Sequence, residues 1–146
     1  MFARLRDALE PGGQLAVHMP NNMQQSTHTL ARALAAETLY ADALGGRTLG
    51  MAVHSLERYA LLLKRLGFAE QHTREMVYVH ALPSRDAVVE WVRGSMLTWY
   101  LNALGPDLFA SFFDTYRARL LAALPDDAPL PFTYRRMLLW ARLADA

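Results

Sequence analysis

The chain has 146 residues, of which 53% are apolar and 20% charged, as in a globular protein of ordinary domain size. Its formal net charge is +1 and its basic residues are scattered singly, so we expect neither a nucleic-acid partner nor an acidic membrane surface. There is no cysteine and no apolar stretch of about 18 residues, which predicts a cytoplasmic protein without disulfides, thiolate metal sites or a membrane span.

A helix, a tight turn and a strand are predicted at the start of the chain. Apolar residues recur at helical spacing over residues 1 to 10, and Pro11-Gly12-Gly13 ends that pattern. The continuous apolar run Leu15-Ala16-Val17 predicts a strand at about 14 to 19 that is buried on both faces. Ser26 is then expected to cap a helix that runs to about residue 37.

The middle of the chain is predicted to form a loop, a helix and a second strand. Residues 40 to 53 contain two adjacent glycines and no periodic pattern, which is typical of a loop. Ser55 begins an amphipathic segment that ends at Gly67, as in a capped helix. Residues 73 to 82 are rich in β-branched and aromatic side chains and predict a strand closed by a proline.

A long helical block and a last strand complete the predicted order. The block covers about residues 84 to 124, with Ser84 or Asp86 as its cap and a break at Gly94. After a proline-rich connector, residues 134 to 143 predict the third strand. The pattern is α/β, but three strands are few, since open sheets of this class have about five or six. The chain therefore has the pattern of one half of a doubly wound domain.

Four stretches of the sequence resemble the trans-aconitate methyltransferase family, a class I S-adenosylmethionine-dependent group. They are "LEPGGQLAVHMPNN", "SLERYALLLKRLGF", "YVHALPSRDAVVEWVRGSMLTWYL" and "LPFTYRRMLLWA". The resemblance implies that residues 1 to 146 form a single partial methyltransferase domain, the C-terminal half of a Rossmann-like fold. It implies a mixed sheet in which the last strand lies between the other two, antiparallel to both, and a helical lid over residues 84 to 124.

The resemblance also implies a reaction, the methylation of one carboxylate of a small polycarboxylic acid to a methyl ester. A carboxylate is already ionised at neutral pH, so the reaction needs alignment and cations that hold the remaining carboxylates more than it needs a strong base. Arginine is well suited to that task. The candidate substrate-binding residues are Trp91, Arg93, Tyr100, Arg135 and His80, with Trp99 and Arg136 beside them.

This sequence departs from the family in ways that bear on substrate and cofactor. Thr98 and Trp99 stand where the family usually has Arg and Pro, which puts trans-aconitate itself in doubt as the substrate. The glycine-rich turn and the acidic residue that hold S-adenosylmethionine in the family have no counterpart here. The nearest glycine pattern, residues 45 to 51, follows no predicted strand and is interpreted as a flexible loop. No cofactor-binding or metal-binding residue is therefore predicted, and we expect the chain alone to be inactive.

Two alternatives stay open at this point. The chain could be a non-catalytic interaction module, or a split-gene subunit that pairs with a chain carrying the nucleotide-binding half. It could also be part of a methyltransferase that acts on another small acid or on a carrier-bound acyl chain. Without the nucleotide-binding half, the apolar strand at 14 to 19 would lie unpaired at a sheet edge, and we expect a homo-oligomer formed through that edge.

Overall fold

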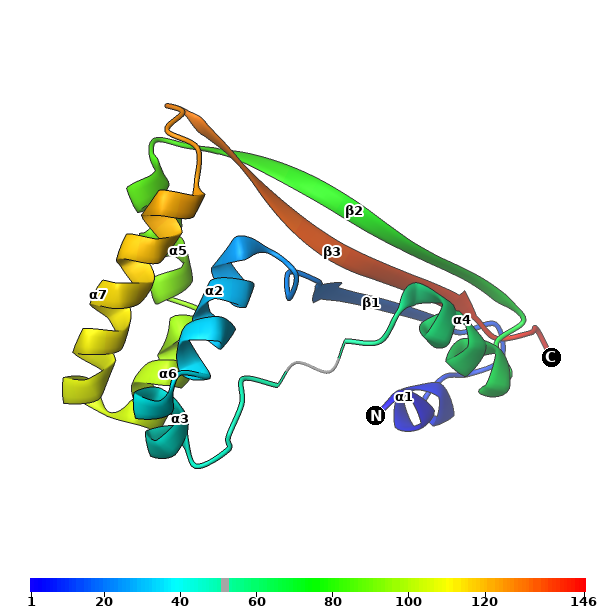
Figure 1. The fold of residues 1–146 in the computed structure, drawn as a ribbon. Helices are drawn as coiled ribbons and strands as arrows, with labels where there is room; N and C mark the ends of the chain where they lie inside the picture. Colours follow the sequence, from blue (N-terminus) through cyan, green and yellow to red (C-terminus); the bar gives the residue numbers. More distant parts are fainter. Residues whose placement is uncertain (51–52) are drawn as a thin grey trace. The chain divides into compact units, whose positions relative to one another are not determined.

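A computed structural model describes residues 1–50 and 53–146 of the chain. Within the described residues the elements are, in chain order, α1 (Phe2–Asp7), β1 (Gln14–Pro20), α2 (Ser26–Ala35), α3 (Thr38–Leu44), α4 (Leu56–Arg65), β2 (Glu70–Leu82), α5 (Arg85–Arg93), α6 (Leu97–Leu104), α7 (Pro106–Ala123) and β3 (Leu130–Arg142) (Figure 1). They form two compact units, whose described residues are 1–21, 53–78 and 134–146 in unit 1, and 22–50 and 79–133 in unit 2. The fold is α/β, as predicted.

The three strands form one sheet in the order β1-β3-β2. β1 and β3 are antiparallel, with Gln14 opposite Arg142. Ion pairs join Glu70 to Arg142 and Glu75 to Arg135, so β2 and β3 are antiparallel as well. The predicted order, with the last strand between the other two and antiparallel to both, is confirmed. The described strands therefore form an antiparallel sheet and not the mixed sheet that was expected, with β1 and β2 running parallel to each other on either side of β3.

Unit 1 packs α4 against one face of the sheet. Successive side chains of a strand point to opposite faces, so alternate residues of β3 are buried. The buried core residues of this unit are Leu15, Tyr59, Leu63, Phe68, Met137, Leu139 and Ala141. The expectation that β1 is buried on both faces is wrong, because Ala16 is exposed while its neighbour Leu15 is buried. Among the described residues, no strand pairs with the outer edge of β1.

Unit 2 is a helical body with an aromatic core. Phe112 of α7 is fully buried, stacks on Tyr100 of α6 at 4.8 Å between ring centroids, and meets the edge of Tyr40 at 5.1 Å. The Tyr116 hydroxyl donates a hydrogen bond of 3.1 Å to the backbone carbonyl of Thr27, which ties α7 to α2. This core fixes the positions of α2, α3 and α6 within the unit.

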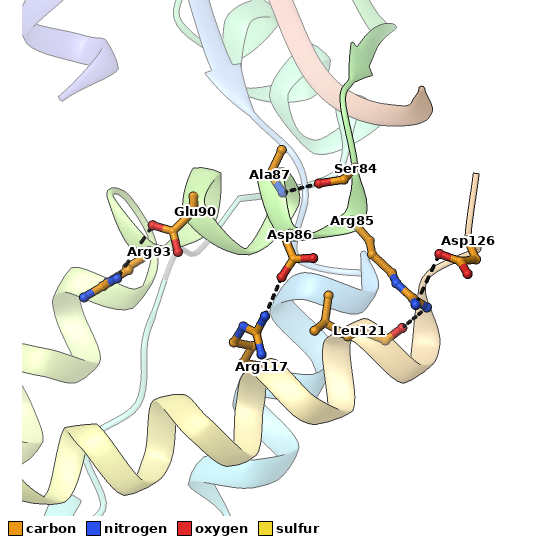
Figure 2. A network of polar contacts seen from close by, with 9 residues as sticks. All are labelled: Ser84, Arg85, Asp86, Ala87, Glu90, Arg93, Arg117, Leu121 and Asp126. Atoms are coloured by element: carbon orange, nitrogen blue, oxygen red, sulfur yellow. Dashed lines mark hydrogen bonds and ion pairs between the residues drawn. The ribbon is translucent and has the colours of Figure 1, made fainter. Parts of the chain in front are cut away.

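Several local predictions are confirmed by the helix ends. The Ser84 hydroxyl accepts a hydrogen bond from the Ala87 amide at the start of α5 (Figure 2). Gly94 follows the end of that helix. Helices α5, α6 and α7 occupy the block predicted over residues 84 to 124. In unit 1, the Ser55 hydroxyl caps α4, and Gly67 with φ of 83° ends it. None of the described helices is both long and apolar enough to cross a membrane.

Other local predictions are wrong. α3 begins at Thr38, where a loop was expected from residue 40, because Tyr40 and Leu44 become buried within unit 2. The loop expectation for residues 51 and 52 lies outside the described residues. Ser26 is the first residue of α2 and does not cap it, since Gln25 precedes the helix and its carbonyl accepts the first helical hydrogen bonds.

The later two strands are longer than predicted. β2 begins at Glu70 and β3 at Leu130, in both cases before the residues with strong β-propensity. The charge pair between Glu70 and Arg142 lies across the two strands at one end, where the Ala69 amide also donates to the Arg142 carbonyl at 2.9 Å. Pairing with a neighbouring strand therefore decides where these strands begin, more than the local residue types do.

Candidate functional site

A small pocket in unit 2 combines an apolar lining with cationic and hydroxyl groups. Its volume is about 210 Å³, and it lies among α2, α3, the segment after α3, and α6. The apolar lining comes from Ala35, Ala36, Ala41, Leu44 and Leu49, and the polar side chains are Arg32, Arg47, Thr48 and Tyr100. Pockets for drug-sized ligands begin at about 300 Å³, so this one suits a smaller molecule.

Arg32 supplies the cation of this pocket that has no partner among the described residues. It projects from α2 and is half-buried, and its guanidinium makes no hydrogen bond or ion pair with any residue that the structure describes. Its positive charge affects the pKa of two neighbouring side chains, His28 and Tyr100. Burial lowers the pKa of His28, and the positive charge of Arg32 lowers it further. A guanidinium that is partly removed from water and has no counter-ion favours the binding of an anion.

Tyr100 places a buried phenol beside that cation. The side chain is 1% exposed and is held between Phe112, stacked at 4.8 Å, and Trp99, edge-on at 5.0 Å. Burial raises the pKa of Tyr100, and the charge of Arg32 opposes that shift. The hydroxyl is therefore neutral at physiological pH and can donate a hydrogen bond to an anion.

Arg47 anchors the segment that closes the pocket. Its Nε donates to the Leu44 carbonyl at 2.9 Å and its Nη2 donates to the Ala103 carbonyl at 3.1 Å. These bonds join the end of α3 to the end of α6 within unit 2. Because a guanidinium carries five N–H donors, Arg47 retains further donors beyond these two bonds. The part of the glycine-rich segment that is described, residues 45 to 50, is thus anchored at Arg47, and Met51 lies outside the described residues.

Two of the predicted substrate-binding residues lie together in an aromatic cluster of unit 2. The rings of His80 and Trp91 are 5.0 Å apart, and those of Trp91 and Phe132 are 6.1 Å apart. Trp91 is 40% exposed, so part of its ring faces solvent. Neither residue lines the pocket that contains Tyr100.

Arg93 lies in a different groove. Its guanidinium is 3.7 Å from the Glu90 carboxylate (Figure 2). It also lies 5.0 Å from the centroid of the Phe113 ring. Both charged side chains are more than half exposed. The groove has a volume of about 620 Å³ and is formed by α5, α6 and α7, with Leu97 and Phe109 in its lining. Arg93 and Tyr100 therefore line different hollows of unit 2.

Arg135 belongs to unit 1 and is paired there. Its guanidinium is 2.9 Å from the Glu75 carboxylate, which also accepts a hydrogen bond of 2.6 Å from the Asn21 side chain. The neighbouring Arg136 lies over the ring of Tyr134 at 5.0 Å. Adjacent strand residues point to opposite faces, so the two arginines cannot bind the same group.

The structure thus separates the predicted site residues, and it adds two that the sequence reasoning missed. Arg32 and Arg47 were missed because nothing in the sequence brings residues 32, 47 and 100 together. The only local signal was a single arginine inside the apolar run "LARALAA" of α2.

No group of three or more potential metal ligands occurs among the described residues. The ion pairs of Arg85 and Arg117 shown in Figure 2 are largely exposed and join α5 to α7 and its following segment.

No family model matches the chain. Curated proteins do match it. It is 41% identical over 146 residues to the trans-aconitate 2-methyltransferase of Streptomyces coelicolor, and the match covers 97% of this chain and 48% of that protein. The enzymes of the same name from Rhizobium meliloti and Methylobacterium nodulans are 39% and 36% identical, over 86% and 97% of this chain.

Over most of its length the chain is homologous to trans-aconitate 2-methyltransferases. It spans about half the length of the curated relatives it matches, 49% of the Rhizobium meliloti protein and 56% of the Methylobacterium nodulans protein. The family resemblance read from the sequence is confirmed. The trans-aconitate 2-methyltransferase relatives match a stretch that includes both units, because the Streptomyces coelicolor protein aligns with 97% of the chain.

Proposed function

We propose that this chain is the substrate-side part of an S-adenosylmethionine-dependent methyltransferase that esterifies a carboxylate of a small organic acid. The observation that carries the proposal is the 34–41% identity to trans-aconitate 2-methyltransferases over most of the chain. Trans-aconitate is a polycarboxylate, and the protein that esterifies it must hold the carboxylates that do not react. The pocket in unit 2 supports the binding of a carboxylate, because it places a cation that has no partner among the described residues beside a neutral phenol.

Arg93 and Arg135 are weaker candidates than Arg32 for binding a substrate carboxylate, because both already form ion pairs. Arg93 and Arg135 each face a carboxylate of their own, Glu90 and Glu75, so a substrate would have to displace that partner. Arg32 has no such competitor among the described residues. Binding of an anion at Arg32 therefore replaces only water, whereas binding at the other two arginines breaks an existing pair.

The described residues do not fit the methyl donor. A nucleotide-like ligand is held over a glycine-rich turn that follows a strand, with an acidic residue after the next strand on its ribose. Here β1 is followed by Asn21 and Asn22, and the adjacent glycines Gly45 and Gly46 follow a helix instead of a strand. We therefore place the donor site in the part of the relatives that this chain does not match, and we expect no methyl transfer by this chain alone.

A chimera tests the proposed function directly. The chain would replace the segment that it matches in the Streptomyces coelicolor relative, with a second chimera built on the Methylobacterium nodulans relative. We expect each chimera to form a methyl ester of a small carboxylic acid when supplied with S-adenosylmethionine, measured by mass spectrometry. The parent enzymes serve as positive controls, and the same enzymes with the segment deleted serve as negative controls. Chimeras with parental circular dichroism that esterify no acid would refute the proposal.

A second candidate function is a non-catalytic interaction module. The outer edge of β1 favours it, because that edge carries no paired strand among the described residues. An open edge presents unpaired N–H and C=O groups to another chain. Such a module would associate with a partner chain, or with itself, and would contribute no substrate contact to the chimera.

A further inference from the structure

We propose that the pocket in unit 2 binds one carboxylate attached to a short apolar body, and that Arg32 is the residue that selects it. This inference deepens the proposed function, on which it rests for the choice of a carboxylate as the anionic group. It narrows the class of acid from a compact polycarboxylate to an acid with a single charge. Three features of the pocket support this inference: its lining, its cations and its volume.

The lining of the pocket is largely apolar. Five apolar side chains from α2, its C-cap, α3 and the segment after α3 face the pocket, and no acidic side chain of the described residues does. An ionised group buried against such a lining without a partner is strongly disfavoured. A ligand with three carboxylates would have to place at least one of them against apolar atoms. A ligand with one carboxylate can place it at Arg32 and leave its apolar remainder against the lining.

The two cations of the pocket differ in how many of their donors are already bonded. Arg47 donates to the Leu44 and Ala103 carbonyls, which hold its guanidinium in place as part of the wall and leave its remaining N–H groups as secondary donors to a ligand. Arg32 commits its guanidinium to no described residue. The Tyr100 hydroxyl adds a neutral donor, since burial raises its pKa. One uncommitted guanidinium and one phenol match the two oxygens of a single carboxylate.

The volume of the pocket limits the size of the ligand. The pocket measures about 210 Å³, which is the space of about seven water molecules at roughly 30 Å³ each. An unbranched acid of six carbons has eight non-hydrogen atoms and fits a space of this order. Because each buried methylene contributes a roughly constant free energy, affinity should rise about fourfold per added carbon until the pocket is full. A surface arginine without a pocket would show no such rise.

Calorimetric titration of the full chain with butanoate, hexanoate, trans-aconitate and 1-hexanol tests the inference. We expect hexanoate to bind more tightly than the other three, since butanoate has a shorter body, 1-hexanol lacks the charge, and trans-aconitate carries surplus charge. The quenching of Trp99, whose ring packs 5.0 Å from that of Tyr100, gives an independent optical readout. Tighter binding of trans-aconitate than of hexanoate, or no binding of hexanoate at millimolar concentration, would overturn the inference.

Variants separate the roles of charge and fold. Arg32→Gln should weaken hexanoate binding about tenfold or more while leaving the weak binding of 1-hexanol unchanged, because only the charged hydrogen bonds are lost. Arg32→Lys should recover part of the affinity. Arg58→Gln removes an exposed arginine of α4 in unit 1 and serves as the matched control. Equal hexanoate affinity in the wild type and a folded Arg32→Gln variant would refute the assignment.

The binding assay and the chimera assay fail independently. If the chimera esterifies acids but the chain does not bind hexanoate through Arg32, the pocket inference is wrong and the proposed function stands. If hexanoate binds through Arg32 but no chimera transfers a methyl group, the proposed function is wrong and the pocket is a carboxylate site of another kind. Together the two measurements therefore show which claim is wrong, the proposed function or the pocket inference.

Discussion

Removal of the Tyr116 hydroxyl should destabilise unit 2 at neutral pH and make it less sensitive to alkali. Tyr116 is fully buried, and its hydroxyl donates to the Thr27 carbonyl at 3.1 Å. In Tyr116→Phe the carbonyl loses that donor, and a typical net loss for one such bond is about 1 kcal/mol. For a chain of this size, that corresponds to a decrease in Tm of about 4 °C.

At alkaline pH, Tyr116→Phe should lose less unfolding free energy than the wild type does. Burial, followed by the proximity of Tyr100, raises the pKa of Tyr116 well above its ordinary value. The folded state therefore retains a proton that the unfolded chain loses above about pH 10, so the stabilisation is fully present below that pH and is lost as the pH rises. The wild type should lose about 1.4 kcal/mol of unfolding free energy per pH unit from this group, and Tyr116→Phe should lose that much less.

Urea denaturation followed by circular dichroism between pH 7 and pH 11 measures both effects. Tyr78→Phe is the matched control, because Tyr78 is 37% exposed and its hydroxyl donates, among the residues that the structure describes, only to the Met76 sulfur at 3.9 Å. We expect the control to match the wild type at every pH. If Tyr116→Phe and the wild type have the same alkaline slope, the hydroxyl is not buried as described and the reasoning is wrong.

Three further predictions concern other parts of the chain. Burial, followed by the charge of Arg32, lowers the pKa of His28, so the unfolding free energy should fall as the pH drops below about 6.5; His28→Gln should flatten that decline in urea titrations, and an unchanged decline would contradict it. Gly45 has φ of 57° at the end of α3 with no atom near its missing Cβ, so Gly45→Ala should lower stability by about 1 kcal/mol in thermal melts, and a stabilised variant would contradict the cap. Self-association through β1 predicts a sedimentation mass above 16.4 kDa that Ala16→Lys reduces, whereas a wild-type monomer at tens of micromolar would show that the edge is protected.

Local sequence information was sufficient where a structural feature depends on neighbouring residues. The caps at Ser55 and Ser84 and the stop at Gly67 form through bonds and dihedral angles within a few residues, so their types predict them. The existence of the three strands follows from their β-branched and apolar content. The order of the strands was predicted from the family resemblance, which carries information about a tertiary arrangement that no local pattern contains.

What only the tertiary structure decided is which side chains meet. α3 forms because Tyr40 and Leu44 become buried in unit 2, a gain that local propensity does not include. Arg93 and Arg135 had the right chemistry for a carboxylate, but Glu90 and Glu75 neutralise them in space. The pocket joins residues from α2, from the segment after α3 and from α6, which are far apart in the sequence. Such a site depends on the packing of whole elements, because the free energy that brings distant residues together comes from burying the core between them.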